Sequence, residues 1–340
     1  MTADGSARQM MADFAHLAPS QALRGMELTI VRRLEGYLRG EHLGLLPGPG
    51  SELAEARLYR PGEDDVRHMD WAVTARTTQP HVRDVVADRE LETWALVDLS
   101  GSMQFGTSDH RGRALDKRDL AVAAVATVGV LTGRIGDRFG GYVLSERGTA
   151  RHPARAGRMA LASLLRSLVE HPRHQVDPGR ATAGIALGPA IDALGAAQPR
   201  RGLRVVVSDF LEPEVSAWRR PVDEPPPWAR PMRKLSVRHQ VLAVEVVDPR
   251  EGVLPDIGVV DLVDPETGQT LEVDTGKAAT RQAFAAAAAA HRERVRVTMR
   301  RAGVAHLVLR TDSDWIKDTA RFVLAHRVHA HRLHAVRRGA

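Results

Sequence analysis

The stretch of this chain that decides the fold is Trp94-Ala95-Leu96-Val97-Asp98-Leu99-Ser100-Gly101-Ser102. Its first four residues form an apolar run, which is typical of a buried strand. The pattern Asp-x-Ser-x-Ser begins directly after this run, so one carboxylate and two hydroxyls lie at the carboxyl end of the predicted strand. Hard divalent cations such as Mg²⁺ prefer oxygen ligands and often take only one or two carboxylates plus water. We therefore predict a cation site at Asp98, Ser100 and Ser102.

Two more oxygen-bearing residues follow at a distance. Thr182 lies in a loop before a predicted helix, and Asp209 comes directly after the predicted strand 203–208. Ligands of parallel sheets bind outside the carboxyl ends of strands, so Asp209 is expected near Asp98 and reaches the ion through water. Two buried carboxylates without a compensating charge are costly, and some cation is expected beside them.

The order of these residues resembles the metal-ion-dependent adhesion site of von Willebrand factor A domains. The resemblance implies that Mg²⁺ or Mn²⁺ is held by Asp98, Ser100, Ser102, Thr182 and Asp209. The chain departs from the pattern at Arg180 and Ala181, where A domains commonly have two glycines. A basic Arg180 near the site would weaken a divalent cation or replace it. The alternative is a metal-free loop in which Asp and Ser cap exposed backbone N–H groups.

Strand and helix patterns alternate from residue 94 onward. Strands are predicted at 94–98, 139–144, 203–208, 240–247 and 306–310. Helices are predicted at 117–134, 159–169, 281–301 and 314–337, and one more begins after Thr182 and runs to about residue 197. This alternation favours an α/β fold with a mostly parallel sheet covered by helices on both faces. The resemblance implies the von Willebrand A-like, Rossmann-like version of that fold.

The chain divides into three predicted parts. Residues 1–27 are a mixed N-terminus, 28–92 are an elaboration that packs on the main domain, and 93–337 are the main domain. Insertions are expected at 211–238 and 249–276. The first contains a proline-rich irregular loop, 213–231, whose exposed side chains are expected to contact a partner; the alternative is that its tryptophans pack on the protein itself. The candidate contacts are Trp218, Arg219, Arg220 and Trp228. The second insertion is acidic and is expected to form a hairpin that turns at 264–268.

Composition narrows the class of protein. The chain has 340 residues, 43% of them hydrophobic, and no cysteine, which fits a reducing compartment. The first thirty residues lack an apolar signal core, and no apolar run approaches the ~20 residues that span a bilayer. We expect a cytoplasmic protein that reaches a membrane only through partners. The formal charge of +6 invites a nucleic-acid partner, but only 4% of the residues are aromatic and no Lys/Arg block is present, so a nucleic-acid partner is not favoured.

Two further segments carry a family resemblance. The segments 57–71, beginning Arg57-Leu58-Tyr59-Arg60-Pro61-Gly62-Glu63-Asp64, and 247–251, reading Val247-Asp248-Pro249-Arg250-Glu251, resemble signatures of domain-of-unknown-function family 58. These are prokaryotic proteins with a von Willebrand A-like domain, and the likeness covers roughly residues 40–320. The resemblance implies a scaffold or adaptor that works with a MoxR-type AAA+ ATPase. Within the first segment, Trp71 is expected to bury against the sheet.

The predicted function is a non-enzymatic, metal-dependent protein-binding module. An acidic side chain from the partner would complete the coordination of the ion. No phosphate-binding loop is present in the sequence. A Mg²⁺-dependent phosphohydrolase is a weaker alternative, because dehalogenase-type phosphatases use Asp-x-Asp and the second acid is here Ser100. A metal-free structural scaffold is the other alternative.

Overall fold

The computed structural model describes Ile30 and residues 32–33, 56–59, 66, 69, 71–83, 92–108, 114–132, 137–173, 186–196, 201–211 and 224–338. The chain divides into two compact units. The first unit comprises Met1–Leu43 and Leu91–Phe322, and the second comprises Gly44–Glu90 and Val323–Ala340. The first unit contains the main sheet and every site residue discussed below that the structure describes.

The first unit is built on a six-stranded sheet in the order β12-β9-β8-β3-β6-β7. All neighbours pair in parallel except β6 and β7, which are antiparallel. Numbered along the chain, this is the doubly wound order 3-2-1-4-5-6, in which the strand order reverses between β3 and β8. The strands are β3 (Glu92–Asp98), β6 (Arg138–Ser145), β7 (Gly148–Ala156), β8 (Leu203–Ser208), β9 (Gln240–Val247) and β12 (Ala305–Arg310). The α/β fold predicted from the sequence is confirmed.

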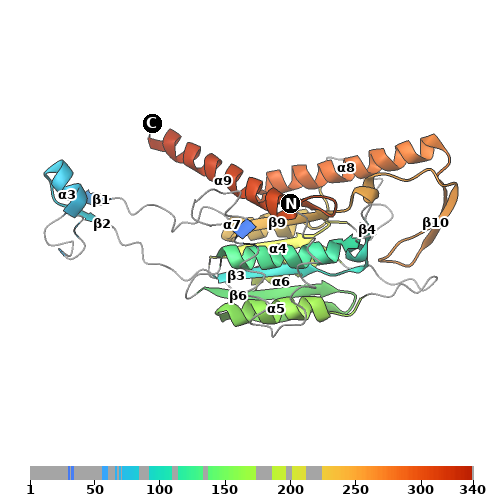
Figure 1. The fold of residues 1–340 in the computed structure, drawn as a ribbon, viewed down its shortest axis with the longest axis horizontal. Helices are drawn as coiled ribbons and strands as arrows, with labels where there is room; N and C mark the ends of the chain where they lie inside the picture. Colours follow the sequence, from blue (N-terminus) through green and yellow to red (C-terminus); the bar gives the residue numbers. More distant parts are fainter. Residues whose placement is uncertain are drawn as a thin grey trace. The chain divides into compact units, whose positions relative to one another are not determined.

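Helices cover both faces of this sheet (Figure 1). On one face, α4 lies across β3, β8 and β9, and α5 packs beside it on β6. On the other face, α6, α7 and α8 enclose a core that includes Trp94, Leu96 and Val206. Side chains alternate between the two faces of a strand, and both faces of this sheet are covered. Strands β3 and β8 therefore carry apolar residues at most of their positions. The helices are α4 (Lys117–Thr132), α5 (Arg158–Glu170), α6 (Leu187–Ala196), α7 (Ala229–Arg238), α8 (Ala278–Ala302) and α9 (Trp315–Arg338).

Two elements differ from the sequence prediction. Strand β7 was not expected, because it has no large apolar residue and contains Pro153. It is the antiparallel edge strand of the sheet, where a proline is tolerated and one side faces solvent. Helix α7 begins at Ala229, inside the segment 213–231 that was predicted to be irregular. Pro231 lies in its first turn, where a missing N–H group costs nothing.

Smaller elements surround the carboxyl end of the sheet. The 3₁₀ helix η2 (Gly101–Gln104) follows β3 directly, and β4 (Gly106–Ser108) pairs with β5 (Ala114–Asp116). The 3₁₀ helix η4 (Pro249–Gly252) follows β9. Strands β10 (Val259–Val263) and β11 (Thr270–Asp274) form an antiparallel hairpin separate from the main sheet, as the turn residues 264–268 predicted.

The second unit contains an antiparallel pair, β1 (Ala56–Leu58) and β2 (His81–Arg83), with helix α3 (Trp71–Thr77) between them in sequence. The N–H group of Tyr59 donates to the carbonyl of Pro80 and extends the pairing. Trp71 is the first residue of α3, and its side chain is not buried within this unit, being 69% exposed. Its burial against the main sheet stays a prediction.

Candidate functional site

The candidate site lies where the strand order reverses. Asp98 is the last residue of β3, and Asp209 directly follows the last residue of β8. These two strands are neighbours and run in parallel, so their carboxyl ends meet at one edge of the sheet. Ligand sites of open α/β sheets form in this crevice. The structure thus brings Asp98, Ser100, Ser102 and Asp209 to one place, as the sequence predicted.

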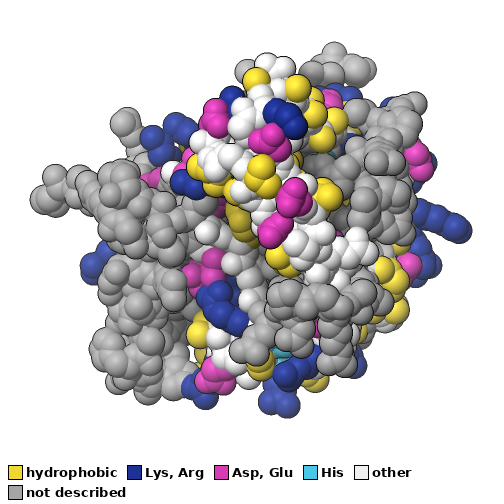
Figure 2. Space-filling view, turned by 90° about the vertical axis from the view of Figure 1, so that its right-hand side faces the viewer, with side chains coloured by type: hydrophobic (Ala, Val, Ile, Leu, Met, Phe, Trp, Pro, Cys, Tyr) yellow, Lys and Arg dark blue, Asp and Glu magenta, His cyan; other side chains and the backbone are white. Residues whose placement is uncertain are grey.

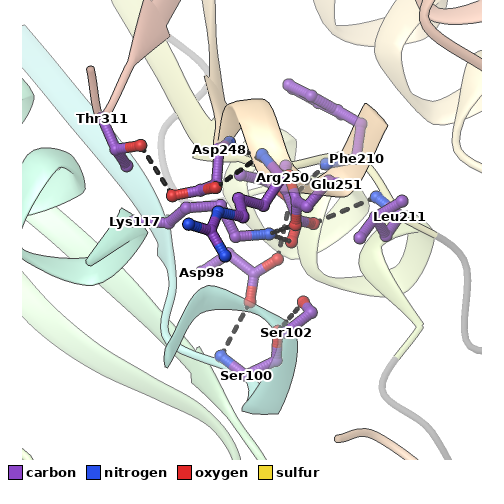
Figure 3. Close-up of polar contacts among 12 residues, drawn as sticks. Asp98, Ser100, Ser102, Lys117, Phe210, Leu211, Asp248, Arg250, Glu251 and Thr311 are labelled. Carbon is purple, nitrogen blue, oxygen red and sulfur yellow. Dashed lines mark hydrogen bonds and ion pairs between the residues drawn. The ribbon is translucent and has the colours of Figure 1, made fainter. Parts of the chain in front are cut away.

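The motif residues form a tight, buried loop (Figure 3). Asp98 Oδ1 accepts a hydrogen bond from the backbone N–H of Ser100 at 3.0 Å, and Asp98 Oδ2 accepts one from the Ser208 hydroxyl at 2.7 Å. The hydroxyls of Ser100 and Ser102 lie 3.3 Å apart. All three motif side chains therefore point into one small, polar space.

A fully buried lysine stands beside this loop. Lys117, the first residue of α4, is 0% exposed and donates from Nζ to Asp209 Oδ2 at 2.7 Å. The same ammonium group donates to Glu251 Oε1. Glu251 is held in place by a capping box, because its other oxygen accepts the N–H of Asp248 at 3.1 Å. A cation is expected beside the buried carboxylates, and at Asp209 this cation is the ammonium group of Lys117.

The protonation of the two aspartates differs because Lys117 serves only one of them. Burial, aided by the charge of Asp209, raises the pKa of Asp98 to about 7. Burial also disfavours the charged form of Asp209, but the Lys117 ammonium outweighs it and holds the pKa of Asp209 below its usual value. Burial lowers the affinity of Lys117 for its proton, yet Asp209 and Glu251 together raise its pKa. A second cation at this site would therefore act mainly on Asp98.

A fourth carboxyl group reaches the site from the acidic insertion. Glu266, in the turn between β10 and β11, accepts the backbone N–H of Ser102 through Oε1 at 3.0 Å. Its carboxyl group lies beside the hydroxyls of Ser100 and Ser102, and burial raises its pKa. The sequence does not assign Glu266 or Lys117 to the site. Glu266 is distant from the motif in sequence, and Lys117 resembles an ordinary surface charge at the start of a helix.

The donor set fits Mg²⁺. Asp98, Ser100, Ser102 and Glu266 supply only oxygen atoms, which hard divalent cations prefer. The 3.3 Å between the two hydroxyls is close to the roughly 3 Å that separates neighbouring ligands of an octahedral ion bound at 2.0–2.1 Å. Among the described residues, no group of three or more His, Cys, Asp and Glu could hold a metal ion. A site here would therefore depend on the serine hydroxyls as much as on the carboxylates.

The remaining predicted site residues are settled only in part. Thr182, Trp218, Arg219 and Arg220 lie outside the described residues, and their roles stay predictions. Trp228 is not an exposed partner contact, because it is 2% exposed and packs on Phe210 with ring centroids 5.1 Å apart. The physical reason is that α7 begins at the next residue. Trp228 is therefore the N-cap of α7, and its indole ring packs in the core that α6 and α7 enclose.

The sequence itself identifies the family. Over residues 55–294 the chain matches the family described as "Protein of unknown function DUF58". The chain belongs to the DUF58 family. Uncharacterized proteins of Mycobacterium bovis and Mycobacterium tuberculosis are 48% identical to this DUF58 protein over 315 residues, covering 92% of this chain and 91% of theirs. The family resemblance of segments 57–71 and 247–251 is thereby confirmed.

Two solved structures align with the DUF58 chain. The VWA domain of SpRpn10 aligns over 68% of this chain and 93% of its own, with a TM-score of 0.34 and 11% identity. An uncharacterized membrane-spanning protein from Vibrio fischeri aligns over 69% of this chain and 98% of its own, with a TM-score of 0.21 and 14% identity. At these scores neither structure carries an argument about function. In the ranges that the structure describes, no helix of the DUF58 chain has both the length and the apolar character needed to cross a bilayer.

Proposed function

We propose that this DUF58 domain is a non-enzymatic, metal-assisted protein-binding module. The observation that carries the proposal is the convergence of Asp98, Ser100 and Ser102 in a buried polar space at the strand-order reversal. These residues would hold Mg²⁺ or Mn²⁺, with Asp209 acting on the ion through water. When bound, the ion supplies an electrophilic centre, because few direct protein charges surround it. The ligand chemistry that suits such a centre is a carboxylate on a partner protein.

The partner class follows from the family resemblance. DUF58 proteins resemble partners of MoxR-type AAA+ ATPases, and we propose such an ATPase, or a client of it, as the protein that binds at the metal. In the native host, the ATPase should co-purify with wild-type protein in Mg²⁺ and be lost in EDTA and with Asp98→Asn. Equal recovery under all three conditions would place the ATPase contact elsewhere on the protein.

Metal binding should be visible as a thermal shift. A ligand that binds only the folded state stabilises it by about 2.7 kcal/mol at one hundred times its Kd. For a unit of this size that corresponds to roughly 5–11 °C in Tm. Differential scanning fluorimetry in EDTA and in rising Mg²⁺ measures it. Asp98→Asn should abolish the shift, whereas the control Asp192→Asn, which changes an exposed carboxylate on α6, should retain it. A full shift in Asp98→Asn would refute the site.

A metal-free scaffold is the second candidate, and the Lys117–Asp209 pair favours it. That pair already neutralises one of the two buried aspartates without any metal. In this case the motif loop would serve only to cap backbone N–H groups, as the Ser100 N–H bond to Asp98 does. The thermal shift separates the two candidates, since a scaffold of this kind gains no stability from Mg²⁺.

Phosphohydrolase activity is not expected. A strand-end nucleophile needs a second acid to protonate the leaving group, and Ser100 stands at that position. Both oxygens of Asp98 also accept hydrogen bonds, one from the Ser100 N–H and one from the Ser208 hydroxyl at the end of β8. The purified protein should therefore hydrolyse neither ATP nor p-nitrophenyl phosphate above the buffer rate in Mg²⁺. Turnover that vanishes in Asp98→Asn would overturn the non-enzymatic assignment.

A further inference from the structure

The β10–β11 hairpin forms an arm, defined here as residues 259–274, that ends in the candidate site. Its two strands pair in register from Val259 opposite Asp274 to Val263 opposite Thr270. It belongs to neither edge of the main sheet. In Figure 1 it lies at the same end of the domain as β4, which follows the motif loop in sequence. The arm is therefore an addition to the sheet whose tip reaches the site.

The tip of the arm is built to present one side chain. Asp264 Oδ1 accepts the N–H of Glu266 at 2.9 Å, and Asp264 Oδ2 accepts the hydroxyl of Thr267 at 2.7 Å. The N–H of Gly268 donates to the Asp264 carbonyl at 2.8 Å, with Gly268 at a φ of 71° that favours glycine. These bonds fix the turn before Glu266 makes any contact with the site. The carboxyl group of Glu266 is thus held in a defined position.

Glu266 takes the place that a partner's carboxylate would take. Its Oε1 accepts a hydrogen bond from the Ser102 N–H at 3.0 Å, and its carboxyl group lies beside the hydroxyls of both serines. Those hydroxyls are also the oxygens that would hold the ion. Nothing in the turn itself requires this contact, because Asp264 accepts the N–H groups of Glu266 and Gly268 and the hydroxyl of Thr267 without it. The contact is therefore directed at the site.

The arm is held mainly at its ends. At its base, Thr275 donates from both its N–H and its hydroxyl to the carbonyl of Gly258, at 2.8 and 2.7 Å. Along its length, hydrophobic side chains remain exposed instead of packing on the domain: Val259, Leu262, Val263 and Leu271. Figure 2 looks onto this end of the domain and shows hydrophobic and acidic side chains exposed side by side. A two-stranded hairpin with so little buried apolar surface is marginally stable, so opening the arm costs little.

We propose that Glu266 is an internal ligand that completes the metal site and must leave before an acidic side chain of a partner protein binds. This inference rests on the proposed function and names its regulation and its ligand class. The closed arm gives the ion a carboxylate from the chain itself. A partner segment that presents Asp or Glu competes for the same position. The arm therefore lowers the apparent affinity of the site for a partner. Only the open state binds the partner, so the apparent affinity is the affinity of the open state multiplied by the fraction of time that the arm is open.

Chemical rescue with acetate tests this directly. Glu266→Ala should weaken Mn²⁺ binding by about tenfold or more, the scale on which metal sites respond to loss of a supporting group. Acetate at millimolar concentration should restore much of that affinity in Glu266→Ala and change little in the wild type. The control is Glu272→Ala, which removes an exposed acid from β11 of the same arm. Water-proton relaxation by Mn²⁺ measures affinity, and hydrogen exchange of the backbone N–H groups of β10 and β11 should rise in Glu266→Ala only.

The outcomes separate the two proposals. Acetate-dependent rescue together with faster exchange in the arm supports the internal ligand. If wild type binds Mn²⁺ and Glu266→Ala binds it equally, with unchanged exchange in the arm, the internal ligand is refuted while the metal site stands. If wild type itself binds no Mn²⁺, the proposed function fails and the inference fails with it.

Discussion

Replacing Lys117 with methionine is expected to remove about 3–5 kcal/mol of folding free energy, the cost of breaking a buried ion pair by deleting one partner. Lys117 is fully buried, and its loss leaves Asp209 and Glu251 without the ammonium group that pairs with both. For a unit of this size the Tm should fall by roughly 6–20 °C. Chemical denaturation at neutral pH in EDTA measures the change without any contribution from metal.

The chain offers a matched control for this substitution. Lys234→Met removes the lysine of an exposed pair with Asp192, in which the side chains are 73% and 46% exposed and lie 2.9 Å apart. Exposed pairs contribute about 0–1 kcal/mol, so this variant should be nearly as stable as wild type. The double variant Lys117→Met with Asp209→Asn should recover part of the loss, because it also removes one unpaired charge. Equal stability of Lys117→Met and Lys234→Met would contradict the buried-pair account.

Without metal, Asp98 should make the protein less stable as the pH rises. The folded carboxyl has a pKa of about 7 against an ordinary value of 3.8. Between these values the folded state keeps a proton that the unfolded state has released, so stability falls with rising pH. The contribution of Asp98 to the free energy of unfolding is complete below pH 3.8 and is lost as the pH rises through 7. The difference corresponds to about 4 kcal/mol.

Asp98→Asn isolates this effect, because the amide does not titrate. In EDTA, the Tm of Asp98→Asn relative to wild type should rise steadily from pH 5 to pH 8, while Asp192→Asn should track wild type throughout. Saturating Mg²⁺ should remove the trend, since a bound cation favours the charged carboxylate. Parallel curves for Asp98→Asn and wild type in EDTA would show that Asp98 is ionised without cost in the folded state.

The fold and half of the site follow from short-range sequence patterns. The apolar runs at 94–97 and 205–207 belong to β3 and β8, which are buried on both faces and therefore carry no polar alternation. Once these are parallel neighbours, the positions of Asp98 and Asp209 at one edge follow from geometry alone. Strand β7 escapes such reasoning, because an edge strand needs little apolar character and Pro153 argues against a strand.

The other half of the site depends on long-range placement. Lys117 begins a helix and by composition looks like a solvated charge; only the need of two buried carboxylates for a cation points to it. Glu266 lies 164 residues from Ser102, and although the turn at 264–268 predicts a hairpin, it gives no direction for its tip. The prolines before Trp228 predict an irregular loop and not the start of a helix, so the sequence suggests an exposed interface residue where α7 in fact begins one residue later. In each case the missing information is the tertiary position of an element, not its type.

The most direct test of the metal site is the stoichiometry and affinity of Mn²⁺ on metal-free protein, measured by electron paramagnetic resonance of the free ion. The Asp98 account predicts one Mn²⁺ per wild-type chain, displaced by excess Mg²⁺, with binding lost in Asp98→Asn and strongly weakened in Ser102→Ala. Asp192→Asn should bind like wild type. Absence of a stoichiometric site in wild type, or a site that persists unchanged in Asp98→Asn, would contradict the account.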